Sequence, residues 1–179
     1  MSAPASATLR SFTDRLVAAL RLERAVYEEL EADRGATLQA ALVVALGAIA
    51  AGLGSGLRVG MVGFGVATLI GLASWSLYAW IVYLFGTTIF KGPETKADWG
   101  EVARTVGFAN APRLLLVLRV FADVASLVTL GVALWTLAAT VVAVRAALDV
   151  TTGRAAVIAV VASVAQVVIT LLLLYLQGY

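Results

Sequence analysis

The stretch GATLQAALVVALGAIAAGLGSGL fills residues 35–57 and contains no charged side chain, although Arg34 and Arg58 flank it directly. A helix needs about 20 apolar residues to cross roughly 30 Å of hydrocarbon. A helix of this composition has no polar face to turn toward water, which is unusual in a soluble protein. The stretch therefore predicts a transmembrane helix over residues 36–57.

Uncharged stretches of similar length follow it along the chain. Residues 59–90 carry no charge, and they predict a second span over 66–88 behind a glycine-rich turn or tilted start at Gly60, Gly63 and Gly65. Further spans are predicted over 102–122, 124–145 and 155–176, the first of which is interrupted by three arginines and Pro112. The sequence thus predicts an all-α, integral membrane bundle of five transmembrane helices, with four spans plus a re-entrant segment as the alternative.

The composition agrees with a membrane location. The 179 residues are 61% hydrophobic and 13% charged, against roughly 45–50% and about 25% in ordinary soluble domains. We expect one transmembrane domain over residues 35–179 behind a cytoplasmic segment over 1–34. The chain has no cysteine and no histidine, which excludes thiolate and imidazole chemistry. We therefore expect a non-enzymatic protein without a metal or cofactor.

The positive charges indicate an orientation, because Lys and Arg concentrate in cytoplasmic loops. The five-span topology places ten of them on one side and two on the other, with Arg113 inside a span. This distribution predicts a cytoplasmic N-terminus and an external C-terminus. The formal net charge is only +2 and the basic residues form no block, so nucleic acid is not an expected partner.

Residues 9–30 predict an amphipathic helix ahead of the first span. Its apolar stripe repeats with helical spacing, and four arginines lie in its first part: Arg10, Arg15, Arg21 and Arg24. These arginines are candidates for binding an anionic leaflet while the stripe enters the interface. The alternative is that the stripe packs on the protein's own bundle. The sequence leaves both open.

The segment between the second and third spans is a candidate surface for a cytoplasmic partner. It contains Lys91, Glu94, Lys96 and Trp99. Gly92 and Pro93 predict a turn, and a helix start follows with Asp98 or Thr95 as its cap.

The third span holds the most unusual group of residues, Asn110, Pro112 and Arg113. Pro112 breaks the helical hydrogen bonding and frees carbonyl groups nearby. An unpartnered guanidinium inside a membrane costs at least roughly 2.5–3.5 kcal/mol. The group is either a polar site for an anionic headgroup or solute, or a kink whose arginine reaches an interface. We also expect Arg119 to pair with Asp123 across one helical turn.

Small residues recur at four-residue spacing in the first two spans, which permits close approach of helices. They either pack these two spans together or form the contact of a homo-oligomer. The residues are Ala48, Gly52, Gly56 and Gly60, and then Gly63, Ala67 and Gly71.

Several short motifs resemble the Yip family (Ypt/Rab-interacting proteins), in its bacterial form. They are Gly107-Phe108 and Ala111-Pro112, Trp135, Arg145-Ala146, Thr152-Gly153-Arg154-Ala155, and Val26-Tyr27-Glu28-Glu29. The resemblance implies five spans, a cytoplasmic N-terminus and, for the bacterial form, a place in the bacterial cytoplasmic membrane. Eukaryotic relatives are associated with Rab GTPases and vesicle traffic, and carry an Asp-Leu-Tyr-Gly-Pro type segment. Here residues 31–36 read EADRGA and Phe108 replaces a common Tyr, which argues against GTPase binding.

These observations favour a membrane scaffold or adaptor linked to membrane organisation or trafficking. Its expected partners are membrane lipids and proteins in the membrane or cytoplasm. Two alternatives remain. One is a small transporter, channel or lipid-handling protein whose polar site lies at the broken third span, and the other is an accessory subunit of a larger membrane complex.

Overall fold

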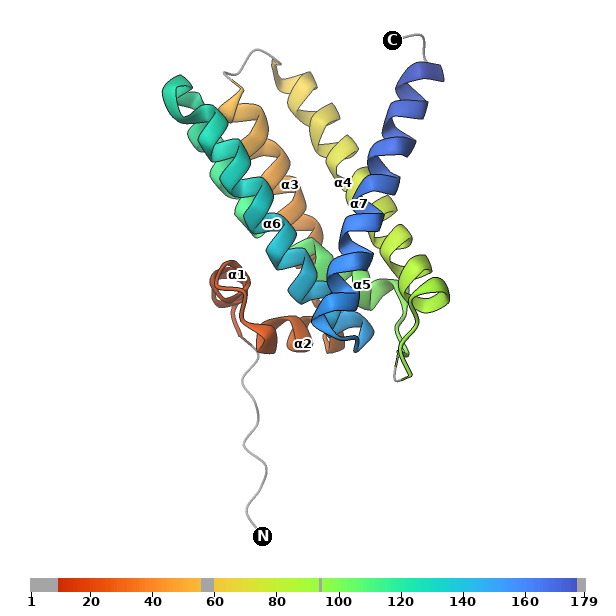
Figure 1. Cartoon of the computed structure of the whole chain (residues 1–179). Coiled ribbons are helices and arrows are strands. Elements are labelled where there is room, and N and C mark those ends of the chain that lie inside the picture. Colours follow the sequence, from red (N-terminus) through yellow and green to blue (C-terminus); the bar gives the residue numbers. More distant parts are fainter. Residues whose placement is uncertain (1–9, 56–59, 94, 177–179) are drawn as a thin grey trace.

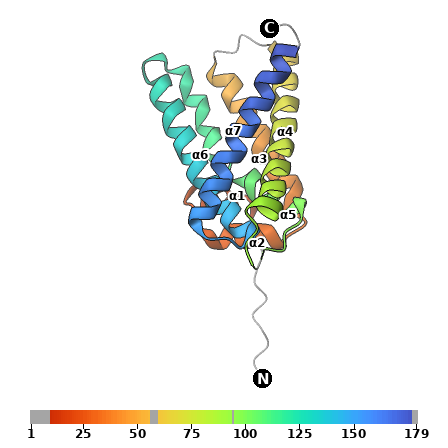
Figure 2. The ribbon, with the colours of Figure 1, turned by 45° about the vertical axis from the view of Figure 1, so that its right-hand side comes forward.

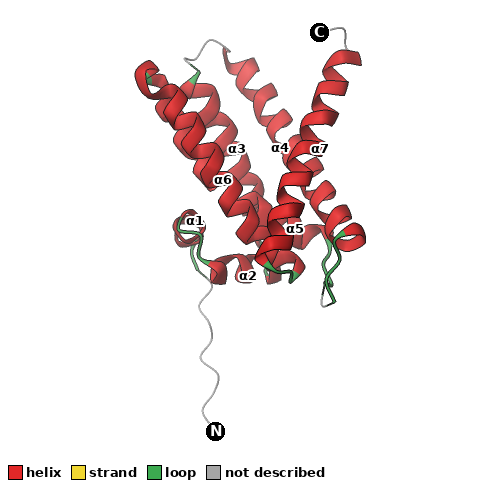
Figure 3. Cartoon of the chain, viewed as in Figure 1, coloured by secondary structure: helices red, strands yellow, loops and turns green. Residues whose placement is uncertain are grey.

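The computed structural model describes residues 10–55, 60–93 and 95–176, and the secondary structure of these residues is entirely helical (Figure 3). Seven α-helices, one π-helix and two 3₁₀-helices follow one another along these residues. They are α1 (Phe12–Leu20), α2 (Arg24–Ala32), α3 (Ala36–Gly54), α4 (Gly60–Leu84), η1 (Phe85–Ile89), α5 (Trp99–Phe108), η2 (Ala111–Val120), η3 (Ala122–Val124), α6 (Ala125–Leu148) and α7 (Thr152–Leu176).

Among the residues that the structure describes, four segments are long and apolar enough to cross a membrane: Ala36–Gly54, Val62–Ile89, Ala122–Leu148 and Thr152–Leu173. Large apolar side chains on them are exposed, including Leu69, Leu127 and Leu172. An exposed apolar surface of this extent requires hydrocarbon around it. The chain is therefore an all-helical, multi-pass membrane protein.

The long helices run between two ends of the bundle (Figure 1). We call the end that carries α1 and α2 the α2 end, and the other, where α7 finishes, the C-terminal end. α3 leads away from the α2 end, α4 returns, α5 and η2 lead away again, α6 returns and α7 leads away (Figures 1 and 2). The described chain thus begins and finishes at opposite ends of the bundle.

The third span predicted over 102–122 is divided between two helices. α5 ends at Phe108, and a ten-residue 3₁₀-helix, η2, begins at Ala111. Pro112 lies in the first turn of η2, where its missing N–H costs no hydrogen bond. The proline signal therefore identified the break, but not the tighter helix that follows it.

The single helix predicted over 9–30 is wrong, because the chain turns between α1 and α2. Leu22 adopts a left-handed conformation with φ 61°, which a side chain with a Cβ disfavours. Ala19, Val26, Tyr27 and Leu30 are fully buried in the core shared with α3 and α6. The apolar stripe packs on the protein's own bundle, as the second interpretation expected.

Arg15, one of the four arginines considered for the membrane surface, holds α1 against α2. Its side chain is 2% exposed and lies 2.8 Å from Glu29 Oε1 and 2.6 Å from Asp33 Oδ2. It also donates to Gln39 Oε1 of α3 at 3.0 Å. Burial alone lowers the pKa of Arg15, but the bonds to both carboxylates outweigh it and raise the pKa. Arg10 pairs with Glu23 and Arg24 pairs with Glu28. Arg21 and Arg24 are the more exposed of the four arginines.

A second buried arginine joins α5 to the end of α2. Arg104 donates from Nε to the carbonyl of Leu30 at 2.9 Å and from a terminal nitrogen to the carbonyl of Glu31. Carbonyls in the last turn of a helix have no intrahelical partner, and Arg104 supplies one for both. Burial raises the pKa of the Glu31 carboxyl to about 7, with further increases from Asp149, Glu101 and Glu28 that outweigh the lowering by Arg104.

The second transmembrane helix starts earlier than predicted. α4 begins at Gly60, whose φ is +60°, and continues through the glycines expected to form a turn. At its far end α4 widens into the five-residue π-helix η1, a form that is rare and short in proteins. Gly71 of α4 contacts Ala48 of α3 closely, with 3.2 Å between the methyl of Ala48 and a Cβ built on Gly71. The small residues of these two helices therefore pack against each other here.

The connection between η1 and α5 is partly tied to the bundle. Asp98 is the cap of α5 and forms a reciprocal capping box with Glu101, whereas Thr95 donates to the carbonyl of Leu148 at 2.7 Å. Lys91 and Lys96 are exposed, but Trp99 is half-buried against the core. Glu94 lies outside the described residues.

Candidate functional site

A cavity of about 790 Å³ lies between α3, α4, α6, α7 and η2. It begins near Trp75 and Tyr78 and extends toward the C-terminal end, where Arg119 and Thr129 line it. α4 and α7 diverge from α3 and α6 toward that end (Figures 1 and 2). The cavity therefore occupies the part of the bundle where the helices separate.

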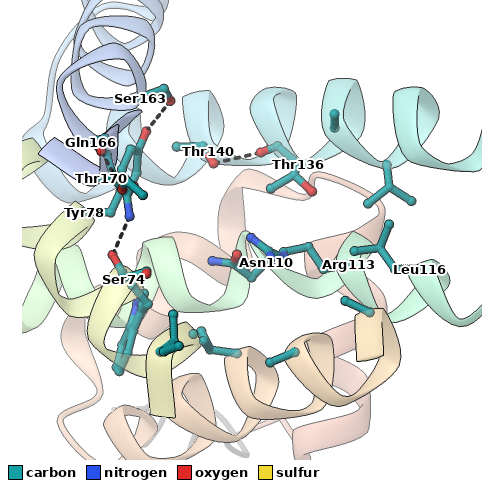
Figure 4. A pocket seen from close by; sticks show the side chains of 18 of the residues that line it. Ser74, Tyr78, Asn110, Arg113, Leu116, Thr136, Thr140, Ser163, Gln166 and Thr170 are labelled. Carbon is teal, nitrogen blue, oxygen red and sulfur yellow. Dashed lines mark hydrogen bonds between the residues drawn. The ribbon is translucent and has the colours of Figure 1, made fainter. Parts of the chain in front are cut away.

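The 3₁₀-helix η2 places its polar residues along one side of this cavity. A 3₁₀-helix has three residues per turn, so side chains three apart lie above one another. Asn110, Arg113, Leu116 and Arg119 have this spacing, and all four line the cavity. Asn110, Arg113 and Leu116 follow one another along η2 in Figure 4. An α-helix would turn Arg119 about a third of a turn away from Arg113.

The two arginines of the cavity differ from the two buried arginines described above. Arg15 binds two carboxylates and Arg104 binds two carbonyls. The side chain of Arg113 has no hydrogen bond or ion pair to any other described residue, although it is accessible from the cavity. The Nε of Arg119 is buried without a partner in the described part of the chain. No Asp or Glu is among the lining residues in the regions described.

Hydroxyl and amide groups from three other helices complete the polar lining (Figure 4). Gln166 of α7 donates to the carbonyl of Ser74 in α4 at 2.9 Å, and Tyr78 of α4 donates to the carbonyl of Ala159 in α7 at 3.0 Å. Thr136 of α6 has a buried hydroxyl without a partner among the described residues. The cavity thus combines two cations with neutral groups that donate or accept hydrogen bonds.

Glycines of α3 and α5 allow η2 to lie deep in the bundle. A Cβ on Gly54 would lie 2.0 Å from the carbonyl oxygen of Leu116, and one on Gly47 would lie 3.2 Å from Cβ of Arg113. On Gly107, a Cβ would lie 2.6 Å from Cβ of Ala40. The backbone of η2 therefore lies directly on α3, which fixes where its arginines point.

The arrangement suits binding an anion better than catalysis. A guanidinium binds phosphate or carboxylate through two parallel hydrogen bonds. Two guanidinium groups line this cavity, and its described lining contains no carboxylate. Within the described ranges, no cluster of carboxylate, imidazole or thiol groups could hold a metal ion.

A sequence model of the Yip1 domain matches residues 18–174. The chain belongs to the Yip1 domain family. The match extends from α1 to the last turn of α7, so it includes every helix that lines the cavity of this Yip1 domain. Comparisons with curated proteins and with solved structures give no match.

The sequence identified only part of this site in the Yip1 domain. Asn110 and Arg113 both line the cavity, while Pro112 is buried at the start of η2. The expected ion pair of Arg119 with Asp123 is wrong among the residues described, because the extended residue Phe121 separates them. Arg119 was missed as a lining residue since its position depends on the 3₁₀ period.

The polar groups of α4, α6 and α7 were missed as well. Ser74, Thr136 and Gln166 are uncharged polar residues scattered through otherwise largely apolar stretches. A single hydroxyl or amide in a transmembrane helix commonly bonds to its own backbone or to a neighbouring helix. Their convergence on one cavity is a property of the tertiary structure.

Proposed function

We propose that this Yip1 domain protein is a non-enzymatic membrane protein that binds the anionic group of a membrane ligand in its central cavity. The observation that supports it is the presence of Arg113 and Arg119 in a cavity whose described lining has no carboxylate. The proposal corresponds to the lipid-handling alternative from the sequence.

The energetic argument starts from the cost of an unpaired cation. A bare guanidinium at membrane depth costs at least roughly 2.5–3.5 kcal/mol. Arg113 and Arg119 lie two 3₁₀ turns apart on one side of η2, so the cost arises twice in one cavity. A phosphate or carboxylate brought into the cavity removes this cost and gains charge-assisted hydrogen bonds. The positive charges of Arg113 and Arg119 therefore favour binding of an anion in the cavity.

We also propose that the chain crosses the membrane five times, with α5 and η2 as the third crossing. Its support is the path of the chain, which leads from the α2 end to the C-terminal end between α4 and α6 (Figure 1). The same proposal places the α2 end in the cytoplasm of a bacterial cell, because the ten Lys and Arg counted for one side gather there and positive loops stay inside.

The scaffold or adaptor function has a separate support at the α2 end. Arg21, Lys91 and Lys96 are exposed there and available to a soluble partner. Removal of residues 1–30 does not test this function, since Tyr27 and Leu30 belong to the core. Replacement of Arg21, Lys91 and Lys96 by glutamate keeps the core intact. An adaptor would lose the proteins that copurify with it, and an unchanged set would contradict this function.

Anion binding is tested with two water-soluble short-chain lipids, dihexanoyl phosphatidylglycerol and dihexanoyl phosphatidylcholine. Each is titrated into the protein in a nonionic detergent while the melting temperature is followed. We expect the anionic lipid to stabilise the wild type more than the zwitterionic one, and Arg113→Gln to lose the difference. Arg21→Gln, which removes an exposed arginine outside the cavity, is the matched control and keeps it. Equal effects of the two lipids on the wild type would refute the proposal.

A further inference from the structure

The contact between α6 and α7 is closed at the α2 end and open toward the C-terminal end. Ala147 and Leu148 of α6 lie in one buried cluster with Ala155 and Ile158 of α7. Farther along, the two helices diverge (Figures 1 and 2). Lining residues of the diverging parts are exposed on both helices, at Thr129, Ala133 and Leu137 of α6 and at Val167, Thr170 and Leu171 of α7. The cavity is therefore open to the side between α6 and α7.

Other neighbouring helices around the cavity touch nearer the middle of the bundle. α3 meets α4 where Ala48 contacts Gly71, and α3 meets η2 where Gly54 contacts Leu116. α4 is joined to α7 by the hydrogen bond from Gln166 to the carbonyl of Ser74. α6 and η2 lie against each other. These contacts lie farther toward the C-terminal end than the buried cluster that joins α6 to α7.

The side opening faces hydrocarbon. α6 and α7 both contain segments long and apolar enough to cross a membrane, and the outward residues Leu130, Leu134 and Val164 are more than half exposed. The rim of the opening is apolar at Leu137 and Val167, and inside the cavity Arg113, Arg119 and Gln166 lie among mostly apolar lining residues. A molecule passing this rim comes from the lipid phase.

We propose that the ligand is a two-chain anionic phospholipid that enters sideways between α6 and α7. Its phosphate binds between Arg113 and Arg119, and its acyl chains stay outside along Leu137, Val167 and Leu171. This inference rests on the proposed anion binding and adds the ligand class and its route. A cavity of about 790 Å³ is the size of a site for a drug-sized molecule, which suits a headgroup and glycerol with the chains left in the membrane.

The charge of the cavity also selects among phospholipids. Every phospholipid has a phosphate for the guanidinium groups, but a zwitterionic headgroup brings a cation as well. That cation would meet Arg113 and Arg119 without a carboxylate in the described lining, and like charges at short range in a medium of low dielectric repel strongly. The geometry therefore favours a lipid whose only charge is negative, such as phosphatidylglycerol.

The route is tested with one fluorescent label on the rim, which is straightforward because the natural chain contains no cysteine. Val167→Cys places the label at the opening. Val168→Cys places it one residue away, on an exposed position that does not line the cavity. Each protein is put into phosphatidylcholine nanodiscs that contain a small fraction of phosphatidylglycerol with brominated acyl chains, whose bromine atoms quench nearby fluorophores.

We expect quenching at position 167 several-fold above the level set by the mole fraction of the brominated lipid, and quenching at position 168 at that level. Adding Arg113→Gln should remove the excess at position 167, and brominated phosphatidylcholine should produce none. No excess at position 167, or an equal excess at position 168, would overturn lateral access. If the short-chain lipids still show an Arg113-dependent preference, anion binding stands and only the route is wrong. If that preference is absent too, the proposed function itself fails.

Discussion

Replacement of Gly54 by alanine tests whether η2 really lies on α3. In the structure an alanine methyl at this position would lie 2.0 Å from the carbonyl oxygen of Leu116 and 3.1 Å from Cβ of Arg119. Ordinary contact begins at about 3.4 Å, so η2 must move by about 1.4 Å. The carbonyl is part of the backbone, so no change of rotamer relieves the contact.

The expected magnitude follows from two opposing effects. Overpacking of a tight contact costs about 1–3 kcal/mol. Alanine is a better helix former than glycine by up to about 1 kcal/mol in a helix interior, but Gly54 is the last residue of α3 and gains little. We expect a net loss of about 1–3 kcal/mol, which corresponds to a melting temperature lower by about 2–12 °C.

The assay is thermal unfolding in detergent, followed by the short-chain lipid titration. Gly131→Ala is the matched control, because it lies inside α6 with no atom within 4 Å of the added methyl, and its melting temperature should be unchanged or higher. Since the shift of η2 carries Arg113 and Arg119 with it, Gly54→Ala should also weaken the preference for phosphatidylglycerol. A Gly54→Ala protein that melts like the wild type and keeps this preference would refute the close contact.

Three further predictions concern the α2 end. Arg104→Met leaves the carbonyls of Leu30 and Glu31 without a donor, and each should destabilise the protein by about 1–3 kcal/mol. Amide hydrogen exchange in α2 should become faster, and unchanged exchange would contradict this role of Arg104. Arg15→Met should cost about 3 kcal/mol, because it leaves the carboxylate of Asp33 unpaired beside a buried site, as measured by thermal unfolding; a loss within 0.5 kcal/mol, about the usual range for a surface substitution, would show that the contact contributes little. The pKa of Glu31 is about 7 in the folded protein, above its ordinary value of 4.5, so the folded state binds this proton more tightly. The stability that the folded protein gains from binding this proton is therefore fully present below pH 4.5 and is lost as the pH rises through 7. In Glu31→Gln, stability measured as a function of pH should fall less over this range than in the wild type. Parallel stability–pH curves for the two proteins would contradict the raised pKa of Glu31.

The transmembrane part of the fold could be read from the sequence because length and apolar composition decide it. α3, α6 and α7 lie within a few residues of the predicted spans, since a long uncharged stretch has few alternatives in a membrane. The turn at Leu22 could not be read, because it contains neither glycine nor proline. Tertiary packing of α1 and α2 against the bundle offsets the unfavourable backbone there.

The site was only half predictable for a similar reason. Pro112 and Arg113 are rare in a transmembrane segment and pointed to it directly. The choice between an α-helix and a 3₁₀-helix after Pro112 depends on contacts with α3, which local propensity does not include. Because an α-helical period was assumed, Arg119 was predicted to face Asp123 instead of the cavity.

The three-residue period of η2 also determines how the protein tolerates insertions and deletions. A 3₁₀-helix rises about 2.0 Å per residue against 1.5 Å for an α-helix, so the ten residues of η2 reach about 20 Å along α3 and α6. Loss of one residue between Arg113 and Arg119 would shorten this reach by about 2 Å and rotate one guanidinium about 120° away from the other. Loss of three residues would bring the guanidinium groups closer while keeping both on the cavity side. Evolution of this segment is therefore expected to conserve spacing in multiples of three more strictly than total length.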